Sequence, residues 1–352
     1  MRAWVVRGRG APWDVFERAE LPEPTPEAVE RYALGLDGLH ERGEGEPACR
    51  DFAIVRVHAA ALAWPDVTMA TGEYPIPIPR PYVSGQEAVG TVEYATPSLA
   101  HLAGRRVVAF TPQPFGSFAE VCVATAPTVF EAPPGMSDEE AAAFLIPSHT
   151  AYQAVHRRGA VREGETVLVL GAAGGVPSSA VQLCAAAGAR VVAVAGGADK
   201  VAFCRELGAD VVVDHREGDF VAAVARAVGP NAVDAIIDFV QGEAGRRART
   251  LLRVEGRHVM AGHAGGLVPV HPNEFYLQNW TLVGCCMGSG YGEELPAIEQ
   301  HAHDDLLRLV REGRYRPRVG RAVGFDAIPD ALRDFEARRV LGRTVARIAT
   351  DR

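Results

Sequence analysis

Residues 166–289 alternate short apolar runs with helical patterns. The apolar runs are rich in β-branched residues and recur at 166–171, 191–195, 211–214, 235–238, 258–261 and 281–285. Helical spacing of apolar residues lies between them, over 177–187, 199–207, 218–227 and 242–252. Strands that alternate with helices through short connections predict an α/β domain with a doubly wound parallel sheet.

The first 130 residues have a different pattern, with many strand-like runs and few helical ones. Between two such runs, residues 72–81 contain proline at every second position or nearly so, which excludes both a helix and a central strand. The tail predicts a helix over 293–312, a strand over 318–323, a helix over 329–337 and a last strand from 343. We therefore expect a β-rich domain of residues 1–145 and 290–352, and a parallel-sheet domain of residues 146–289.

One segment interrupts the β-rich pattern. Thr25 followed by Pro26 is a typical helix start, and apolar residues follow at helical spacing, at positions 29, 32, 33, 36 and 39. The pattern predicts a helix over 26–40 and a polar loop over 41–47, and so a helical insertion over 25–50. We favour a surface decoration over a lid or an interface element.

Composition excludes several classes of function. The chain has 352 residues, of which 48 % are hydrophobic, and a net charge of −8. This charge predicts no nucleic acid partner, and no apolar run is long enough to predict a membrane span. Six cysteines are scattered without CxxC spacing. They predict reduced thiols and a cytoplasmic protein without a signal peptide.

The strand at 166–171 runs into a glycine-rich turn and then at once into a helix. Its residues are Gly171, Ala172, Ala173, Gly174, Gly175, Val176 and Pro177. Glycines let backbone N–H groups approach a pyrophosphate, and the helix N-terminus adds partial positive charge. The turn predicts a dinucleotide site; the alternative is a strand–helix turn that binds no nucleotide.

The end of the second strand bears on which dinucleotide is bound. An acid there would accept hydrogen bonds from a ribose 2′-hydroxyl and repel a 2′-phosphate. The chain has Ala195, Gly196 and Gly197 instead, followed by Asp199 and Lys200, the only lysine in the sequence. A solvated lysine at a helix start is the alternative interpretation of Lys200.

Several stretches together resemble one family. They are "WPDVTMATGEYP" (64–75), "VSGQEAVGTVE" (83–93), "VLVLGAAGGV" (167–176), "ELGADVVVDHREGDF" (206–220) and "RTLLRVEGRHVMAG" (249–262). The chain is similar to the medium-chain dehydrogenase/reductase superfamily, most of all to its zinc-free quinone oxidoreductase branch. The resemblance covers nearly the whole chain except about residues 25–50. The resemblance implies a β-rich GroES-like catalytic domain and a Rossmann cofactor domain.

The resemblance also implies NADPH as the cofactor. Lys200 matches a phosphate-binding lysine of relatives, and His215, with Arg216 next, stands where a tyrosine reaches the 2′-phosphate. Thr150 matches a threonine at the nicotinamide-side phosphate. The walls of the adenine and nicotinamide sites are matched by Phe239, Val240, Gly262, His263 and the strand end at Cys285.

Zinc-dependent members of the superfamily need a cysteine, a His-Glu pair and a further Cys or Asp. The matching positions hold Trp64 and Gln86-Glu87, and no cysteine lies near 148. This set predicts no metal site. Hydride transfer from NADPH to a quinone or an α,β-unsaturated carbonyl (enone) fits such a site.

On the substrate side, Tyr74, His149 and Tyr152 are candidate hydrogen-bond donors, and Trp64 and Tyr74 are candidates to stack on a flat substrate. Core packing is an equally weighted alternative for the two aromatic residues. Relatives have Asn at Ala63 and Tyr at Thr68, so the pocket is expected to be more apolar and roomier. An unusual enone of a specialised pathway and an enoyl thioester both stay open as substrates.

The same departures keep open an NADPH-binding protein with little catalysis. We also expect a homodimer, because strand 281–287 is apolar and predicted at the sheet edge, where it can pair with its copy.

Overall fold

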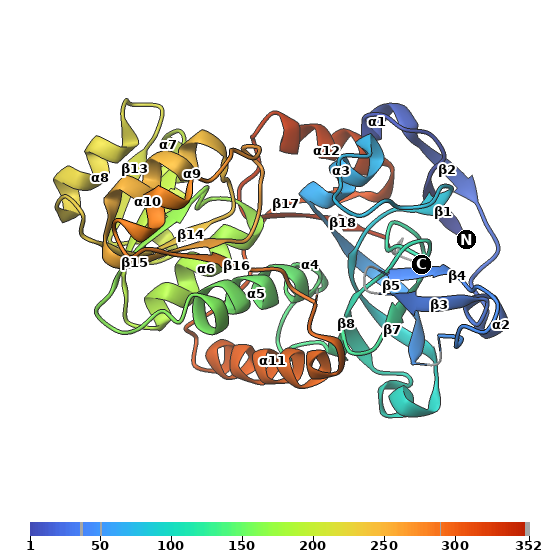
Figure 1. Cartoon of the computed structure of the whole chain (residues 1–352). Helices are drawn as coiled ribbons and strands as arrows, with labels where there is room; N and C mark the ends of the chain where they lie inside the picture. The colour runs from blue at the N-terminus through green and yellow to red at the C-terminus, as the bar shows by residue number, and fades with distance from the viewer. Residues whose placement is uncertain (36–37, 50, 289, 349–352) are drawn as a thin grey trace. The chain divides into compact units, whose positions relative to one another are not determined.

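The computed structural model describes residues 1–35, 38–49, 51–288 and 290–348 (Figure 1). The chain forms two compact units. Unit 1 is Met1–Ile146, Gly288–Gln300 and Val319–Arg352, and unit 2 is Pro147–Met287 and His301–Arg318. Our expectation that residues 301–318 belong to the β-rich domain is wrong. Tyr315 of this segment bonds the hydroxyls of Ser148 and Ser179, both in unit 2.

Unit 2 is built on a six-stranded parallel sheet within the described residues, which confirms the predicted α/β fold class. Its order is β13-β12-β11-β14-β15-β16. The strands are β11 (Thr166–Leu170), β12 (Arg190–Ala195), β13 (Val211–Asp214), β14 (Val233–Asp238), β15 (Leu252–Met260) and β16 (Thr281–Gly284). The order reverses between β11 and β14, as in dinucleotide-binding sheets.

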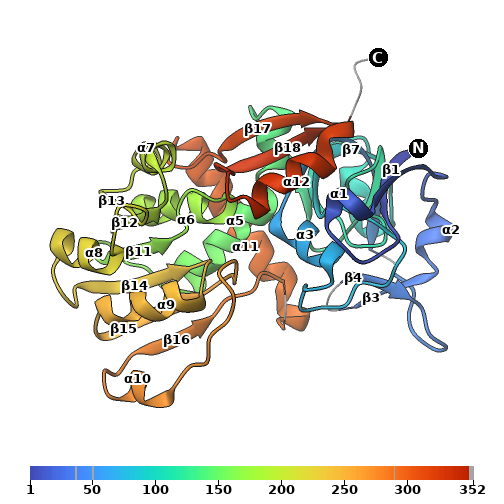
Figure 2. The ribbon, with the colours of Figure 1, turned by 90° about the horizontal axis from the view of Figure 1, so that it is seen from above.

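Helices connect these strands (Figure 2). They are α6 (Gly175–Ala186), α7 (Ala198–Glu206), α8 (Phe220–Val228), α9 (Gly242–Ala248), η3 (Arg249–Leu251) and α10 (Pro272–Tyr276). Before β11 come α5 (Leu145–Tyr152) and η2 (Gln153–Arg158), and after β16 comes α11 (Leu295–Arg311); α5 and α11 each begin in unit 1 and continue in unit 2. The central strands are covered on both faces, so Leu168, Val192 and Ile236 are fully buried in one core. Burial on both faces explains why these strands appear as continuous apolar runs in the sequence.

Unit 1 holds the β-rich pattern. A three-stranded sheet has the order β2 (Phe16–Glu20), β1 (Arg2–Val6), β6 (Tyr82–Val83). A seven-stranded sheet has the order β10 (Val129–Glu131), β8 (Arg106–Phe110), β7 (Glu87–Ala95), β5 (Phe52–Leu62), β18 (Arg343–Arg347), β17 (Val319–Gly324), and β9 (Val121–Thr125) also pairs with β5. Because β18 pairs antiparallel with β5, the tail folds back onto the first domain, as expected.

Short helices complete unit 1. They are α1 (Pro12–Val15), α2 (Pro26–Val29), α3 (Trp64–Thr71), η1 (Pro97–Leu102), α4 (Asp138–Ala142), η4 (Gly292–Glu294), η5 (Phe325–Ala327) and α12 (Ile328–Glu336). No helix in the described part of the chain combines the length and the apolar character that crossing a membrane requires.

The predicted helix over 26–40 is wrong. Among the described residues of this span only α2 (Pro26–Val29) is helical, with the Thr25 hydroxyl accepting from the Ala28 N–H as its N-cap, and a hairpin of β3 (Tyr32–Gly35) and β4 (Gly38–Glu41) follows. Position 36 of the pattern lies outside the described residues. Tyr32 packs edge-on against Phe115, with ring centroids 5.1 Å apart, and this tertiary contact outweighs the helical spacing. The residues from 42 to 49 form a loop, as expected.

A buried ion pair joins β7 to the tail strand β18 in unit 1. The Arg343 Nη2 lies 2.5 Å from Oε2 of Glu87, and both side chains are almost fully buried. The second Glu87 oxygen accepts from the Ile146 N–H at 2.9 Å. Asp66, also fully buried, accepts from the Ala63 N–H at 2.8 Å. Burial raises the pKa of both carboxyls, and the charge of Arg343 opposes that rise.

Replacing Arg343 with Met should therefore strongly destabilise unit 1. The variant leaves Glu87 buried without its cation, and we expect the free energy of unfolding in urea to fall by about 3–5 kcal/mol. Arg347→Met is the matched control, because Arg347 pairs with Glu139 at the surface. It should cost less than about 1 kcal/mol. Equal small losses in both variants would contradict the role given to the buried pair.

Candidate functional site

The parallel strands of unit 2 all end at one edge of the sheet. Ligands of open α/β sheets bind at this edge, next to the point where the strand order reverses. That point lies between β11 and β14. The residues that directly follow the strands include Gly171, Gly196, His215, Phe239, Ala261 and Cys285. The topology thus brings to one edge residues that lie far apart in the sequence.

The glycine turn after β11 has the shape of an anion site. Gly171 has φ +67°, and a Cβ there would lie 2.9 Å from Cγ2 of Val240 in the loop after β14. The Ala172 N–H bonds the Val194 carbonyl, and the Gly174 N–H bonds the Gly171 carbonyl, each at 3.0 Å. These bonds fix the turn through Ala173 so that α6 begins at Gly175. The first N–H groups of a helix have no acceptor within it, which leaves those of Gly175 and Val176 for an anion.

Pro177 is the third residue of α6, and its side chain is buried. It has no N–H, so it removes one potential donor from the first turn. The Ser178 N–H bonds the Gly174 carbonyl at 3.0 Å and closes the turn behind it. The helix start therefore accommodates proline without losing its geometry.

The loops after β12 and β13 lie against each other. Gly197 has φ +97°, and a Cβ at Gly196 would lie 2.4 Å from Nε2 of His215. Asp214 ties the loops together, because its carboxylate accepts from the N–H groups of Gly197 and Arg216, both at 2.9 Å. These hydrogen bonds hold the pKa of Asp214 below its usual value. Lys200 is in the first turn of α7, directly after this loop.

A buried pair organises the loop after β14. One carboxylate oxygen of Asp238 accepts from the N–H groups of Val240 and Gln241 at 2.8 Å, and the other lies 2.8 Å from Nε2 of His258. Both side chains of the pair are almost fully buried. Asp238 therefore positions the backbone of Phe239 and Val240, which the sequence predicted as cofactor walls.

Hydrogen bonds hold the loop after β15 against the loop after β14. The Gln241 side chain donates to the Gly262 carbonyl, and the Gly265 N–H donates to the Val240 carbonyl at 2.7 Å. A Cβ at Gly262 would lie 2.9 Å from the Phe239 carbonyl oxygen, so glycine permits this approach. His263 follows Gly262 directly in the same loop.

Cys285 follows β16, and its N–H donates to the Met260 carbonyl at 2.9 Å. Burial raises the pKa of its thiol, so the group stays protonated near neutral pH and is a poor nucleophile.

The helix that carries Thr150 is fixed to the glycine-turn helix by hydroxyls. The Tyr315 hydroxyl lies 2.5 Å from Oγ of Ser148 and 2.9 Å from Oγ of Ser179. Thr150 itself donates to the Met287 sulfur at 3.7 Å. Sequence reasoning missed Tyr315, which lies far along the chain. It also missed Asp214 and Asp238, although each is an acid that closes a predicted strand.

His149 and Tyr152 both have hydrogen-bond partners within unit 2. His149 is fully buried, with Nε2 3.3 Å from Nδ1 of His303, and burial together with His149 lowers the pKa of His303 to about 3. Tyr152 donates to Asp305 at 2.5 Å. The geometry gives both side chains structural partners, so neither is carried forward as a proton donor.

Unit 1 holds the residues predicted for the substrate side. Trp64 opens α3, and Tyr74 follows the helix, with its N–H bonded to the Thr68 carbonyl at 3.0 Å. Both aromatic side chains are partly buried and pack on the unit 1 core. Thr68 is buried and its hydroxyl donates to the Pro65 carbonyl, so it turns its polar atom to its own helix.

The positions matched to zinc ligands carry no ligand set. Trp64 has no donor for a metal, and the Glu87 carboxylate is taken by Arg343 and Ile146. Within residues 1–35, 38–49, 51–288 and 290–348, no group of three or more His, Cys, Asp or Glu residues is placed to hold a metal ion.

Comparisons with known proteins agree on one family. Residues 50–134 match the alcohol dehydrogenase GroES-like domain, and residues 175–303 match the zinc-binding dehydrogenase family model. Quinone oxidoreductase-like protein 2 of Bos taurus is 29 % identical over 294 residues, which cover 83 % of each chain.

Two solved structures are similar over the whole chain. The quinone oxidoreductase of Thermus thermophilus, described also in complex with NADPH, is 31 % identical, with a TM-score of 0.79, and the match covers 99 % of this chain and 100 % of that one. A probable oxidoreductase from Mycobacterium abscessus is 30 % identical, with a TM-score of 0.80 and 98 % of each chain covered. The chain belongs to the medium-chain dehydrogenase/reductase superfamily, in its quinone oxidoreductase-like branch.

Proposed function

We propose that this protein is an NADPH-dependent reductase that transfers hydride to a quinone or an enone without a metal ion. One observation carries the proposal. The glycine turn, the Lys200 loop and the Asp238 loop follow the carboxyl ends of three neighbouring parallel strands of unit 2. The T. thermophilus relative, whose structure was described with NADPH, supports the choice of cofactor.

The residues present fit this cofactor. The N-terminus of α6 offers the N–H groups of Gly175 and Val176 to a pyrophosphate, and the glycine at 171 keeps a side chain out of its path. At the end of β12, Gly196 and Gly197 replace the acid that would repel a 2′-phosphate, and Lys200 supplies a positive charge. When bound, NADPH supplies the hydride.

The substrate side asks for orientation and a hydrogen-bond donor. Tyr74 is our candidate to donate a hydrogen bond to the carbonyl oxygen, where negative charge develops, and Trp64 is our candidate to stack on a flat conjugated substrate. Ala63 has no polar side-chain atom, and the Thr68 hydroxyl donates to the Pro65 carbonyl of its own helix. That environment favours an apolar substrate, and a bulky enone of a specialised pathway fits it better than an enoyl thioester does.

Turnover distinguishes this proposal from a nucleotide-binding protein with little catalysis. NADPH consumption should accelerate with at least one member of a panel of quinones, enones and enoyl thioesters. The panel also identifies the substrate class, since each group of compounds is tested under the same conditions. NADPH binding without consumption across the panel would contradict the reductase.

Lys200→Ala tests the cofactor site. Loss of one cation at the 2′-phosphate should weaken NADPH binding about tenfold or more and leave NADH binding nearly unchanged, as titrations with each nucleotide measure. Arg205→Ala, at the other end of α7, is the control and should leave both affinities unchanged. An equal loss for both nucleotides in Lys200→Ala would contradict the assignment.

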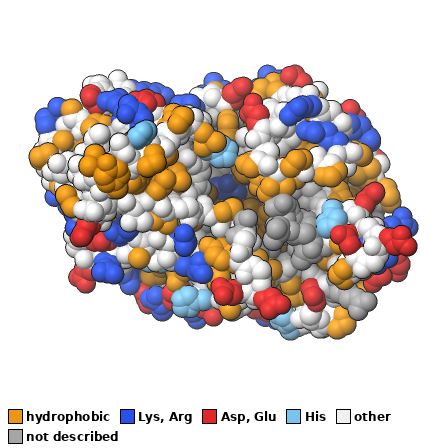
Figure 3. Space-filling model, viewed as in Figure 1, with side chains coloured by type: hydrophobic (Ala, Val, Ile, Leu, Met, Phe, Trp, Pro, Cys, Tyr) orange, Lys and Arg blue, Asp and Glu red, His pale blue; other side chains and the backbone are white. Residues whose placement is uncertain are grey.

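We also propose that the protein forms a homodimer through β16. Within the described residues, β16 pairs only with β15 and is therefore one of the two edge strands of the sheet. The predicted strand 281–287 is shorter than expected and ends at Gly284. The exposed large hydrophobic residues described in unit 2 belong to β15, to α10 and to the loops beside α10, and Figure 3 shows apolar side chains gathered over the region of α10: Val254, Leu267, Val270, Tyr276 and Leu277.

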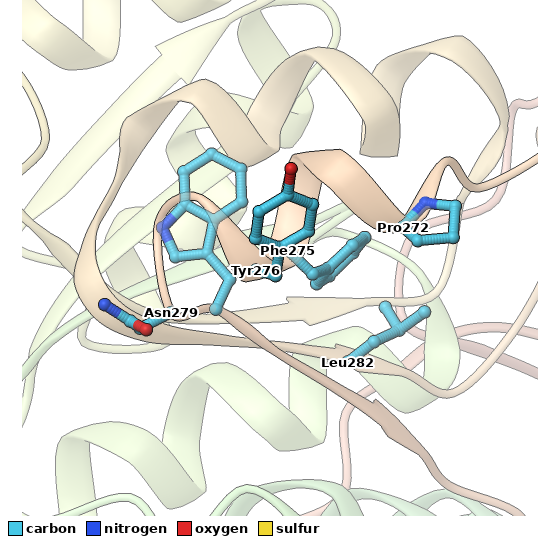
Figure 4. Close-up of a pocket in the computed structure, with 6 residues that line it drawn as sticks. Pro272, Phe275, Tyr276, Asn279 and Leu282 are labelled. Atoms are coloured by element: carbon cyan, nitrogen blue, oxygen red, sulfur yellow. The ribbon is translucent and has the colours of Figure 1, made fainter.

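A shallow pocket lies beside the edge strand β16, whose Leu282 forms part of its lining (Figure 4). Its lining is mostly aromatic and apolar: Pro272, Phe275, Tyr276, Asn279, Trp280 and Leu282. An exposed edge strand flanked by an apolar surface favours pairing with its own copy across a two-fold axis.

Leu277→Asp should therefore convert the dimer into a monomer in light scattering, because a carboxylate would be buried at the interface. Tyr94→Asp is the control, since Tyr94 is an exposed hydrophobic residue of unit 1. It should remain a dimer. A monomeric parent protein, or a Leu277→Asp variant that stays dimeric, would contradict this interface.

A further inference from the structure

The C-terminal end of α3 is held by side chains from two other segments of unit 1. The last carbonyls of a helix have no N–H partner within it, and α3 ends at Thr71. Arg9 lies in the loop between β1 and α1. Its Nε donates to the Thr71 carbonyl at 2.9 Å and its Nη2 to the Gly72 carbonyl at 2.7 Å. Gly72 has φ +76°, and a Cβ there would overlap the Arg9 guanidinium, so glycine permits this contact.

Arg80 reaches the same end of the helix from the proline-rich loop that follows α3. Its Nη2 donates to the Met69 carbonyl at 2.8 Å and to the Ala70 carbonyl at 3.1 Å. Its Nε donates to the Gly8 carbonyl at 2.9 Å, directly before Arg9. One guanidinium therefore joins the helix end, the proline-rich loop and the segment that carries the other arginine.

Arginine suits this task for two reasons. Its planar fork presents several donors in fixed directions, so one side chain bonds two successive carbonyls at once. Its positive charge also favours the C-terminal end of a helix, where the helix dipole is negative. The turn after α3 is thus fixed by charge-assisted hydrogen bonds to its backbone.

Tyr74 follows this turn directly. Its N–H and that of Glu73 both donate to the Thr68 carbonyl, at 3.0 Å and 2.8 Å. The Tyr74 ring packs on the unit 1 core, as does Trp64, which opens the same helix. The direction in which the Tyr74 side chain leaves the backbone therefore depends on the conformation of the turn at Gly72.

We propose that Arg9 and Arg80 are positioning residues of the reductase, which hold the turn after α3 so that the Tyr74 hydroxyl meets the negative charge that develops on the substrate oxygen. This proposal rests on the proposed function, in which Tyr74 is the candidate donor. Both arginines bond backbone carbonyls, so they act through the turn. A displacement of about 1 Å at a reacting group can cost about a hundredfold in rate, so a loosened turn should be visible in kcat.

The test is a double-mutant cycle between Arg80→Met and Tyr74→Phe, measured with the quinone or enone that the parent protein reduces fastest. Methionine keeps an apolar stem and removes the donors. Tyr74→Phe should lower kcat about a hundredfold, as loss of one donor to a developing oxyanion does. Arg80→Met should lower kcat about tenfold when Tyr74 is present and leave KM for NADPH unchanged.

The distinguishing result is the effect of Arg80→Met in the Tyr74→Phe background. There it should cause almost no further loss of kcat, because the hydroxyl that it positions is already absent. A merely structural role would lower kcat by the same factor in both backgrounds.

Arg9→Met enters the same cycle as a second variant and should show the same dependence on Tyr74. Since Arg9 is exposed, this variant keeps the test available if Arg80→Met does not fold. Arg7→Met is the matched control and should leave kcat unchanged, because Arg7 pairs with Glu17 at the surface.

Two results would overturn this inference and leave a reductase in place: equal losses of kcat with and without the Tyr74 hydroxyl, or full kcat in both arginine variants. Full kcat in Tyr74→Phe would overturn it as well, since Tyr74 would then not be the donor. A parent protein that reduces no quinone or enone would instead overturn the proposed function itself.

Discussion

The direction of the strands in unit 2 is the constraint on which the candidate site depends. Parallel strands all end at one edge, so loops separated by more than a hundred residues, such as those at Gly171 and Cys285, meet there. Two carboxylates at strand ends then fix the loops. Asp214 joins the loops after β12 and β13, and Asp238 holds the loop after β14 while it pairs with His258. The loop backbones of the candidate site are in place before any ligand arrives, which reduces the cost of ordering them.

Unit 1 is organised by a different interaction. Its seven-stranded sheet brings the tail strand β18 against β5, and Arg343 of that strand neutralises the buried Glu87. The same carboxylate receives the Ile146 N–H, where the first unit ends. These charged groups have their partners within the core of unit 1. The residues proposed for the substrate side are mainly aromatic and apolar. In the proposed function such residues orient the substrate, and the bound cofactor supplies the hydride.

The sequence predicted the parts of the molecule in which local pattern and tertiary environment agree. Strands buried on both faces produce continuous apolar runs, so the strands of the parallel sheet were located to within a few residues, apart from β15, which begins earlier, at Leu252. The glycine turn and the lone lysine were found because their residue types are unusual at those places. The site roles given to individual residues stay predictions.

Other features depend on contacts that a linear pattern does not contain. The helical spacing at 26–40 was misleading because Tyr32 finds its partner in Phe115, more than eighty residues away in the sequence. His149 was predicted as a candidate donor, and its contact with His303 of α11 could not be foreseen from the sequence pattern. Tyr315 was missed for the same reason, since its two hydroxyl partners come from α5 and α6.

In the proposed reaction, hydride passes from the nicotinamide of NADPH to the β carbon of a conjugated carbonyl. The most direct measurement uses NADPH that carries deuterium on the transferred position, an enone turned over by the protein, and NMR of the reduced product. Hydride transfer to the β carbon predicts deuterium on the β carbon and a solvent-derived proton on the α carbon. A reduced product without deuterium on the β carbon, or deuterium delivered to the carbonyl carbon to give an alcohol, would contradict it.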